Sequence, residues 1–99
     1  MRLGSKIALV TGAGGGLGGA TAIRFAAEGA KVLCSDLDLA KAEKTVSMIE
    51  SRGGTAIAHQ CDIADPAQCN AQVEKAVTCF GRLDVLVNSA GVSLSLIHI

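Results

Sequence analysis

A glycine-rich stretch at residues 11–19 constrains the fold of this chain more than any other feature. It follows the short apolar run at residues 7–10 and precedes a helix-like segment at residues 20–28. Glycine has no Cβ and readily adopts positive φ, so its backbone N–H groups can approach an anion closely. The helix that follows presents unpaired N–H groups and the positive end of its dipole at the same place. This order predicts a phosphate-binding loop, with a pyrophosphate as its natural occupant.

Apolar runs and amphipathic segments alternate along the rest of the chain. Asp38 is expected to cap the second helix, and Asp65, Pro66 and Gln68 form a capping-box pattern at the start of the third. Such alternation predicts a doubly wound, Rossmann-type parallel sheet (α/β) with the spatial strand order 3-2-1-4. The strands are expected at residues 6–11, 31–36, 55–60 and 83–88, and the helices at residues 20–28, 39–52 and 66–80.

Polar and small residues follow all four predicted strands. Ligands of doubly wound sheets bind outside the carboxyl ends of the strands, where the strand order reverses. We therefore expect these strand ends to form one site. They are Thr11-Gly12, Asp36, Asp62-Ile63 and residues 88–91.

The glycine stretch fits two motifs. Gly-x-Gly-x-x-Gly would use Gly14, Gly16 and Gly19, whereas Thr-Gly-x-x-x-Gly-x-Gly would use Thr11, Gly12, Gly16 and Gly18. We favour the second, because Gly12 lies where the strand must turn. A nucleoside triphosphatase loop would need a lysine after its last glycine, and Ala20-Thr21 stands there instead.

Asp36 ends the second predicted strand, where the ribose of an adenosine would pass. A carboxylate there can accept hydrogen bonds from both ribose hydroxyls and would repel a 2′-phosphate, which favours NAD over NADP. No Lys or Arg occurs between Ile7 and Ile23, and Leu37 rather than a basic residue follows Asp36. The alternative is that Asp36 serves only to form a turn.

The two remaining strand ends suit the other parts of a dinucleotide. Asp62 could accept the adenine amino group and Ile63 could lie against the ring, although a loop aspartate is equally common without a ligand. Asn88 could bridge neighbouring strand ends, with small residues after it where the backbone would pass the cofactor.

Charge and cysteine content exclude several classes of protein. The chain has 9 basic and 9 acidic residues without clusters, which argues against a nucleic-acid or acidic-membrane surface. No run reaches the ~20 apolar residues of a membrane span, and no secretory signal is recognised at the start, so a cytoplasmic location is expected. His59 and the four cysteines lack the paired spacing of a zinc site, and we expect them to pack in the core, with no metal bound.

Together these residues resemble the amino-terminal part of a short-chain dehydrogenase/reductase. The resemblance covers residues 1–93, and Asn88-Ser89-Ala90-Gly91 departs from the usual Asn-Asn-Ala-Gly by one residue. It implies NAD(P)-dependent hydride transfer between alcohols and ketones. The cofactor-binding residues that it implies are Gly12, Gly15, Gly16, Leu17 and Gly18 for the pyrophosphate and adenosine ribose, Asp36 for the ribose hydroxyls, Asp62 and Ile63 for adenine, and Asn88, Ala90 and Gly91 for the nicotinamide-side ribose.

The catalytic residues of that family are not expected in this chain. Its acid/base is a tyrosine, and the sequence contains no Tyr. We expect residues 1–93 to be the cofactor-binding part of an oxidoreductase, inactive alone, and residues 94–99 to be a tail that is not native. The last strand, 83–88, would then be left as an unpaired edge. A stand-alone dinucleotide-binding module without catalysis is the alternative. Family members are often dimers or tetramers.

Overall fold

The computed structural model describes residues 4, 6–88 and 95–98. Strands and helices alternate in the predicted order, followed by one further strand. The elements are β1 (Ile7–Thr11), α1 (Gly16–Ala27), β2 (Lys31–Asp36), α2 (Leu39–Ser51), β3 (Thr55–Gln60), α3 (Pro66–Phe80), β4 (Val85–Asn88) and β5 (Ser95–His98). The sheet order is β3-β2-β1-β4-β5, so the predicted order 3-2-1-4 is confirmed. The first four strands in that order are parallel, and β5 runs antiparallel to β4.

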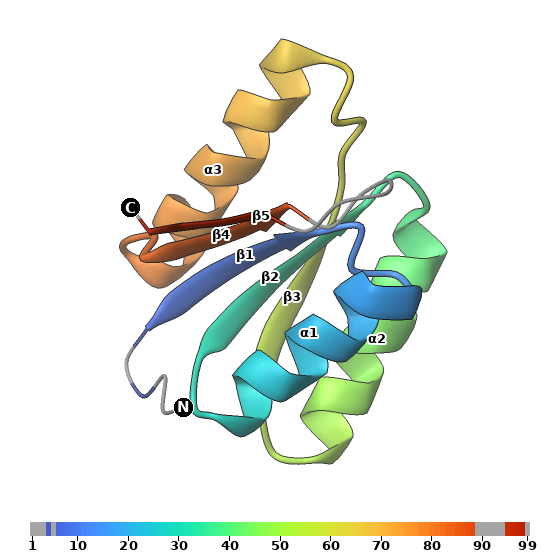
Figure 1. Ribbon diagram of the computed structural model, residues 1–99, viewed down its shortest axis with the longest axis vertical. Helices are drawn as coiled ribbons and strands as arrows, with labels where there is room; N and C mark the ends of the chain where they lie inside the picture. The colour runs from blue at the N-terminus through green and yellow to red at the C-terminus, as the bar shows by residue number, and fades with distance from the viewer. Residues whose placement is uncertain (1–3, 5, 89–94, 99) are drawn as a thin grey trace.

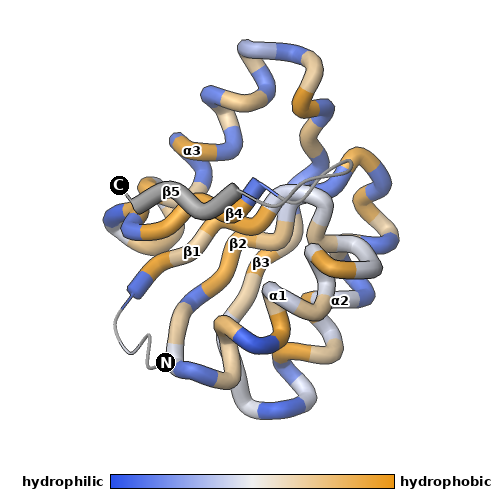
Figure 2. The backbone as a smooth tube through the Cα atoms, in the orientation of Figure 1, coloured by the Kyte–Doolittle hydropathy of each residue, from blue (hydrophilic) through white to orange (hydrophobic). Residues whose placement is uncertain are grey.

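Helices lie on both faces of the sheet: α1 and α2 cover one face and α3 covers the other (Figure 1). Apolar colour is concentrated in β1, β2 and β4, while the helices are mixed (Figure 2). Two clusters of buried side chains match this arrangement, one around Val10, Val32 and Ile49 and one around Leu9 and Leu33. Every residue of β1 is buried, because the strand has neighbours on both edges and helices on both faces.

The first helix begins at Gly16, four residues before the predicted start. Glycine is a poor helix former, so the composition of the loop concealed the helix start. Gly18 and Gly19 are both buried in its first turn, and a Cβ on Gly19 would come within 3.3 Å of the Ala13 carbonyl oxygen. The small residues therefore let the start of α1 pack against the loop.

The start of the last predicted strand is also wrong by two residues, because β4 begins at Val85. Asp84 precedes it and forms two hydrogen bonds with the backbone of Ile7. The Ile7 N–H donates to Asp84 Oδ2 at 2.8 Å, and the Asp84 N–H donates to the Ile7 carbonyl at 2.9 Å. The Asp84 carboxylate thus takes the place of a backbone carbonyl as the acceptor of one hydrogen bond between the starts of β1 and β4.

The capping residues of α2 and α3 are confirmed, but the capping box is not. Asp38 accepts the N–H groups of the first turn of α2, and Asp65 accepts the Ala67 N–H at 2.9 Å. In a capping box, Gln68 would accept the Asp65 N–H. Here Gln68 Oε1 instead accepts the Asp62 N–H at 2.8 Å, and the Asp65 N–H donates to the Asp62 carbonyl. The side chain of Gln68 therefore ties α3 to the end of β3.

The outer edge of β4 is paired, contrary to expectation. β5 forms four residue pairs with it, from Val85 with His98 to Asn88 with Ser95. Residues 95–98, expected to lie in a tail, are therefore part of the sheet. Within residues 4, 6–88 and 95–98, no helix has the length and apolar character needed to cross a membrane.

Candidate functional site

A pocket of about 280 Å³ lies at the carboxyl ends of β1, β2 and β3. It brings together four residues predicted from the sequence, one or two from each strand end. Ser35, Leu37 and Cys61 also line it and were missed. Leu37 could have been selected from the sequence as a pocket residue, because it is an apolar residue in a predicted turn. The full lining is Gly12, Ser35, Asp36, Leu37, Cys61, Asp62 and Ile63.

Three glycines of the loop occupy positions that other residues would fit poorly. Gly12 and Gly16 have positive φ, at 63° and 55°, a conformation that favours glycine. Gly14 is needed for a different reason, because a Cβ there would lie 2.6 Å from Asp36 Oδ2 and 2.5 Å from the Lys41 Cβ. A Cβ on Gly15 or Gly16 would meet no heavy atom within 4 Å. Open space therefore lies beside the loop at these two positions.

Two hydrogen bonds to the backbone of Ala13 hold the loop in place. The Ala13 N–H donates to the Ser35 carbonyl at 2.9 Å, and Thr45 Oγ1 on α2 donates to the Ala13 carbonyl at 2.7 Å. Ala13, Ser35 and Thr45 are all buried, so water competes little for these bonds. The loop is thus fixed between the end of β2 and the middle of α2.

The start of α1 faces the open side of the loop. Gly15 is the N-cap residue and has no side chain that could accept the first N–H groups of the helix. Gly18 is buried in the first turn, whereas Leu17 is 58% exposed. The N–H groups of this turn and the positive end of the helix dipole favour an anion there.

Asp36 already accepts two backbone hydrogen bonds. Its Oδ2 accepts the Gly14 N–H at 2.8 Å and its Oδ1 accepts the Asp38 N–H at 2.9 Å. A carboxylate has about four acceptor positions, so each oxygen retains one. The two bonds fix the carboxylate in the pocket wall and leave it able to accept two hydroxyl groups.

The end of β3 contributes one polar and one apolar group. Asp62 Oδ1 accepts the Ala64 N–H at 2.9 Å, which orients the carboxylate in a local turn. Ile63 is 44% exposed and Leu37 is 65% exposed, although both side chains are apolar. A flat apolar ligand entering this pocket would cover them.

Asn88 lies at the end of β4 and does not line this pocket. Thr11 Oγ1 donates to Asn88 Oδ1 at 2.9 Å, which is the expected bridge between neighbouring strand ends. Ala90 and Gly91, which were expected to follow it along the cofactor, lie outside the described residues.

The expectation of buried cysteines is right for two of them. Cys34 and Cys61 are buried, but Cys69 is half-buried and Cys79 is exposed, because Cys79 falls on the outer face of α3. Burial raises the pKa of Cys34 to about 12, so this thiol stays protonated. Burial and the nearby Lys75 lower the pKa of His59. In the described part of the chain, no three His, Cys, Asp or Glu side chains are grouped as metal ligands would be.

Comparison with known proteins gives one consistent result. The profile of the family described as short chain dehydrogenase matches residues 6–98. The chain is 43% identical over 88 residues to cyclohexanol dehydrogenase of Acinetobacter sp. (strain SE19). This match covers 89% of this chain and 35% of the relative. It is 42% identical over 91 residues to 7alpha-hydroxysteroid dehydrogenase of Escherichia coli (strain K12), covering 92% and 36%.

The solved structure of hydroxysteroid dehydrogenase from Escherichia coli superposes with a TM-score of 0.90 at 42% identity, covering 92% of this chain and 39% of that one. The chain thus spans a little over a third of the length of the curated relatives that it matches. The glycine loop, the strand order and these matches agree, and the chain belongs to the short-chain dehydrogenase family.

Proposed function

We propose that this chain binds NAD and forms the cofactor-binding part, residues 1–93, of an oxidoreductase that acts on an alcohol or the corresponding ketone. The observation that carries the proposal is the single pocket that unites Gly12, Asp36, Asp62 and Ile63 from three strand ends. The names of the relatives, dehydrogenases of cyclohexanol and of a hydroxysteroid, support an alcohol as substrate.

Each part of the dinucleotide has a matching group. The start of α1 and the open space at Gly15 and Gly16 suit the pyrophosphate. The two remaining acceptor positions of Asp36 suit the ribose hydroxyls. Asp62 and Ile63 suit the adenine, and Asn88 with the residues after it suits the nicotinamide side. When bound, NAD supplies the acceptor for a hydride.

The choice of NAD over NADP rests on the charge of Asp36. Among the residues that the structure describes, no Lys or Arg lines the pocket, so a 2′-phosphate there would meet the fixed carboxylate of Asp36. Like-charge contact of this kind disfavours the phosphorylated cofactor. The sequence contains no Tyr, so we propose that the acid/base chemistry depends on residues outside this chain.

Calorimetric titration of the chain with NADH and NADPH tests this assignment. We expect NADH to bind more tightly than NADPH. Asp36→Asn should weaken NADH binding at least about tenfold, because hydrogen bonds to a charged group contribute about 1.5–3 kcal/mol each. The same change should reduce the discrimination against NADPH.

Glu43→Gln is the matched control, since it removes the same charge from an exposed position on α2 outside the pocket lining. It should leave both affinities unchanged. Tighter binding of NADPH than of NADH by the unsubstituted chain, or equal effects of the two substitutions, would contradict the assignment. Circular dichroism of each variant checks that it is folded.

A further inference from the structure

Two cysteines lie on neighbouring segments behind the wall of the pocket. Cys61 follows β3, lines the pocket and is 2% exposed, whereas Cys69 lies in the first turns of α3 and is half-buried. Burial is the largest cause that raises the pKa of the Cys61 thiol, and Cys69 is close enough to add to it. They lie eight positions apart in the sequence, and the fold brings them onto neighbouring segments.

Two further contacts hold the segments that carry these cysteines. The Asp62 N–H donates to Gln68 Oε1 at 2.8 Å, and Cys69 Sγ donates to the Ile63 carbonyl at 3.3 Å. These bonds join the residues that follow Cys61 to the first turn of α3, which carries Cys69. They therefore limit how far the two thiols can separate. This restraint favours a disulfide, which requires the two Cβ atoms to come within about 4.5 Å of each other.

We propose that Cys61 and Cys69 are a redox-sensitive pair whose disulfide lowers the affinity of the pocket for its cofactor. The second half of this proposal rests on the proposed function. Asp62 and Ile63, the residues expected to contact adenine, lie inside the short loop that the disulfide would close.

Hydrogen peroxide is a sufficient oxidant for the reaction. Cys69 is the more accessible thiol, so its thiolate attacks one peroxide oxygen, the O–O bond breaks, and Cys69 becomes a sulfenic acid as hydroxide leaves. The sulfur of Cys61 then attacks the Cys69 sulfur, the S–O bond breaks, and water leaves with the proton of the Cys61 thiol. Two thiols are oxidised to one disulfide and one peroxide is reduced to water. A dithiol reductant reverses the change.

The disulfide would alter the pocket at two points. Cys69 would no longer donate to the Ile63 carbonyl, and the Cys61 sulfur would move toward α3. Burial, with Cys69 and Asp62 adding to it, raises the pKa of Cys61. Cys61 therefore suits the second step of the reaction better than the first.

Trypsin makes the disulfide easy to detect. Cleavage after Arg52 and Lys75 releases one peptide that contains both Cys61 and Cys69, while Cys34 and Cys79 fall in other peptides. After treatment of the folded chain with peroxide and then iodoacetamide, we expect this peptide to have lost two hydrogen atoms and to carry no alkyl group. Treatment with a dithiol before alkylation should restore two alkyl groups. Alkylation of both cysteines after peroxide treatment would overturn the proposal.

Variants separate the pair from the other cysteines. Cys79→Ser, at an exposed position on α3, should still form the disulfide, whereas Cys69→Ser should not. In the unsubstituted chain, oxidation should reduce the NADH affinity roughly fivefold, the size of one lost neutral hydrogen bond. In Cys69→Ser, peroxide should leave the affinity unchanged.

The peptide assay does not depend on cofactor binding, so the two proposals fail separately. A disulfide in a chain that binds no NADH in either redox state would overturn the proposed function and leave the cysteine pair standing. A disulfide that leaves a measurable NADH affinity unchanged would overturn the coupling to the pocket.

Discussion

Gly14 lies where the glycine loop passes the side chains of Asp36 and Lys41. Its N–H donates to Asp36 Oδ2, and a Cβ at this position would lie within 2.6 Å of that oxygen. Neither Asp36 nor the main chain of α2 can retreat without breaking other bonds. Because Gly14 has no side chain, the loop and the Asp36 carboxylate can lie close enough to contact the same ligand.

Substitution of adjacent glycines by serine tests this contact. Gly14→Ser should lower the free energy of unfolding by about 1–3 kcal/mol, the usual cost of forcing a side chain into filled space. Gly15→Ser should leave it unchanged or raise it slightly, because that position is open, its φ is extended, and serine is a better N-cap than glycine. Urea unfolding followed by circular dichroism measures both. Equal losses would show that the packing at Gly14 does not constrain the loop.

At the scale of the elements, α2 fixes the loop as well as covering the sheet. Thr45 is the residue responsible, since its hydroxyl is buried on the inner side of α2 and donates to the Ala13 carbonyl. The loop therefore depends on a helix that comes after α1 and β2 in the chain. This explains why a polar residue occupies a buried position of α2.

Thr45→Val should lower the free energy of unfolding by about 1–3 kcal/mol, because the buried Ala13 carbonyl loses its donor while the side-chain shape is kept. Thr21→Val is the matched control, since Thr21 Oγ1 also donates to a carbonyl, that of Leu17, but in contact with solvent. Its cost should stay within about 0.5 kcal/mol. Chemical denaturation of both variants measures the difference, and losses of equal size would contradict the role of Thr45.

The elements also show how far the sequence alone could lead. The start of α3 was predictable because Asp65 and Pro66 are strong local signals, and the meeting of Asp36 with Asp62 was predictable because parallel strands end at one edge. The start of α1 was not, because its first turn contains glycines that disfavour helix on their own. The bond from the Gly14 N–H to Asp36 and the position of Gln68 depend on how separate backbone segments approach each other, which no local pattern encodes.

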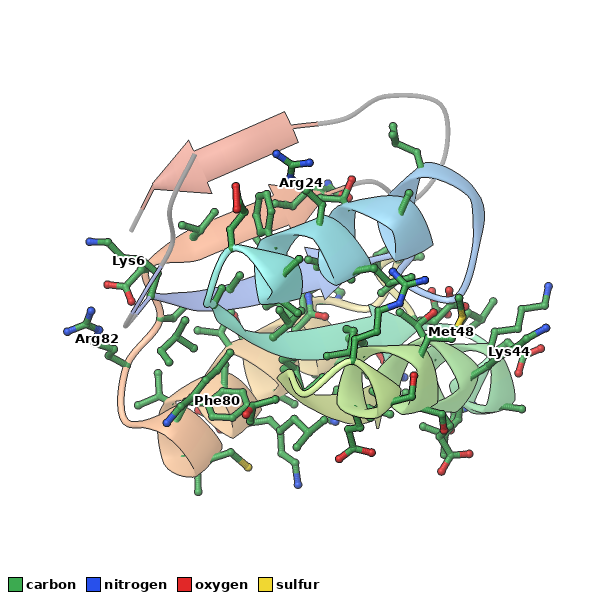
Figure 3. All side chains as sticks on the ribbon, turned by 90° about the horizontal axis from the view of Figure 1, so that it is seen from below. Lys6, Arg24, Lys44, Met48, Phe80 and Arg82 are labelled. Carbon is green, nitrogen blue, oxygen red and sulfur yellow. The ribbon has the colours of Figure 1, made fainter. Side chains whose placement is uncertain are left out.

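At the scale of the whole molecule, Asp84 joins the starts of β1 and β4. The bond from the Ile7 N–H, assisted by Arg82 and Lys6, holds the pKa of Asp84 below its ordinary value of 3.8. Figure 3 shows Lys6 and Arg82 at the same end of the sheet. A carboxyl group whose pKa is lower in the folded chain stabilises the fold above its ordinary pKa. That contribution is lost as the pH falls from 3.8 through the lower folded value.

Asp84→Asn should therefore flatten the acid part of the stability profile. Between pH 7 and about pH 3, below the model-peptide pKa of an aspartate, the unsubstituted chain should lose more of its free energy of unfolding than the variant does. Urea midpoints at the two pH values give the comparison. Parallel profiles would mean that Asp84 does not couple protonation to folding.

The central place of β1 has a consequence for synthesis on the ribosome. Its Thr11 meets Asn88 of β4 across 77 residues of sequence, whereas β2 follows β1 after a single helix. At roughly 5–20 residues per second, β4 is synthesised about 4–15 s after β1. Until then, the edge of β1 that pairs with β4 has no partner strand. During that interval an apolar strand with open hydrogen-bonding groups is available to chaperones and to other nascent chains. Slowing translation between α2 and β4 should therefore increase aggregation of the nascent chain more than slowing it after β4.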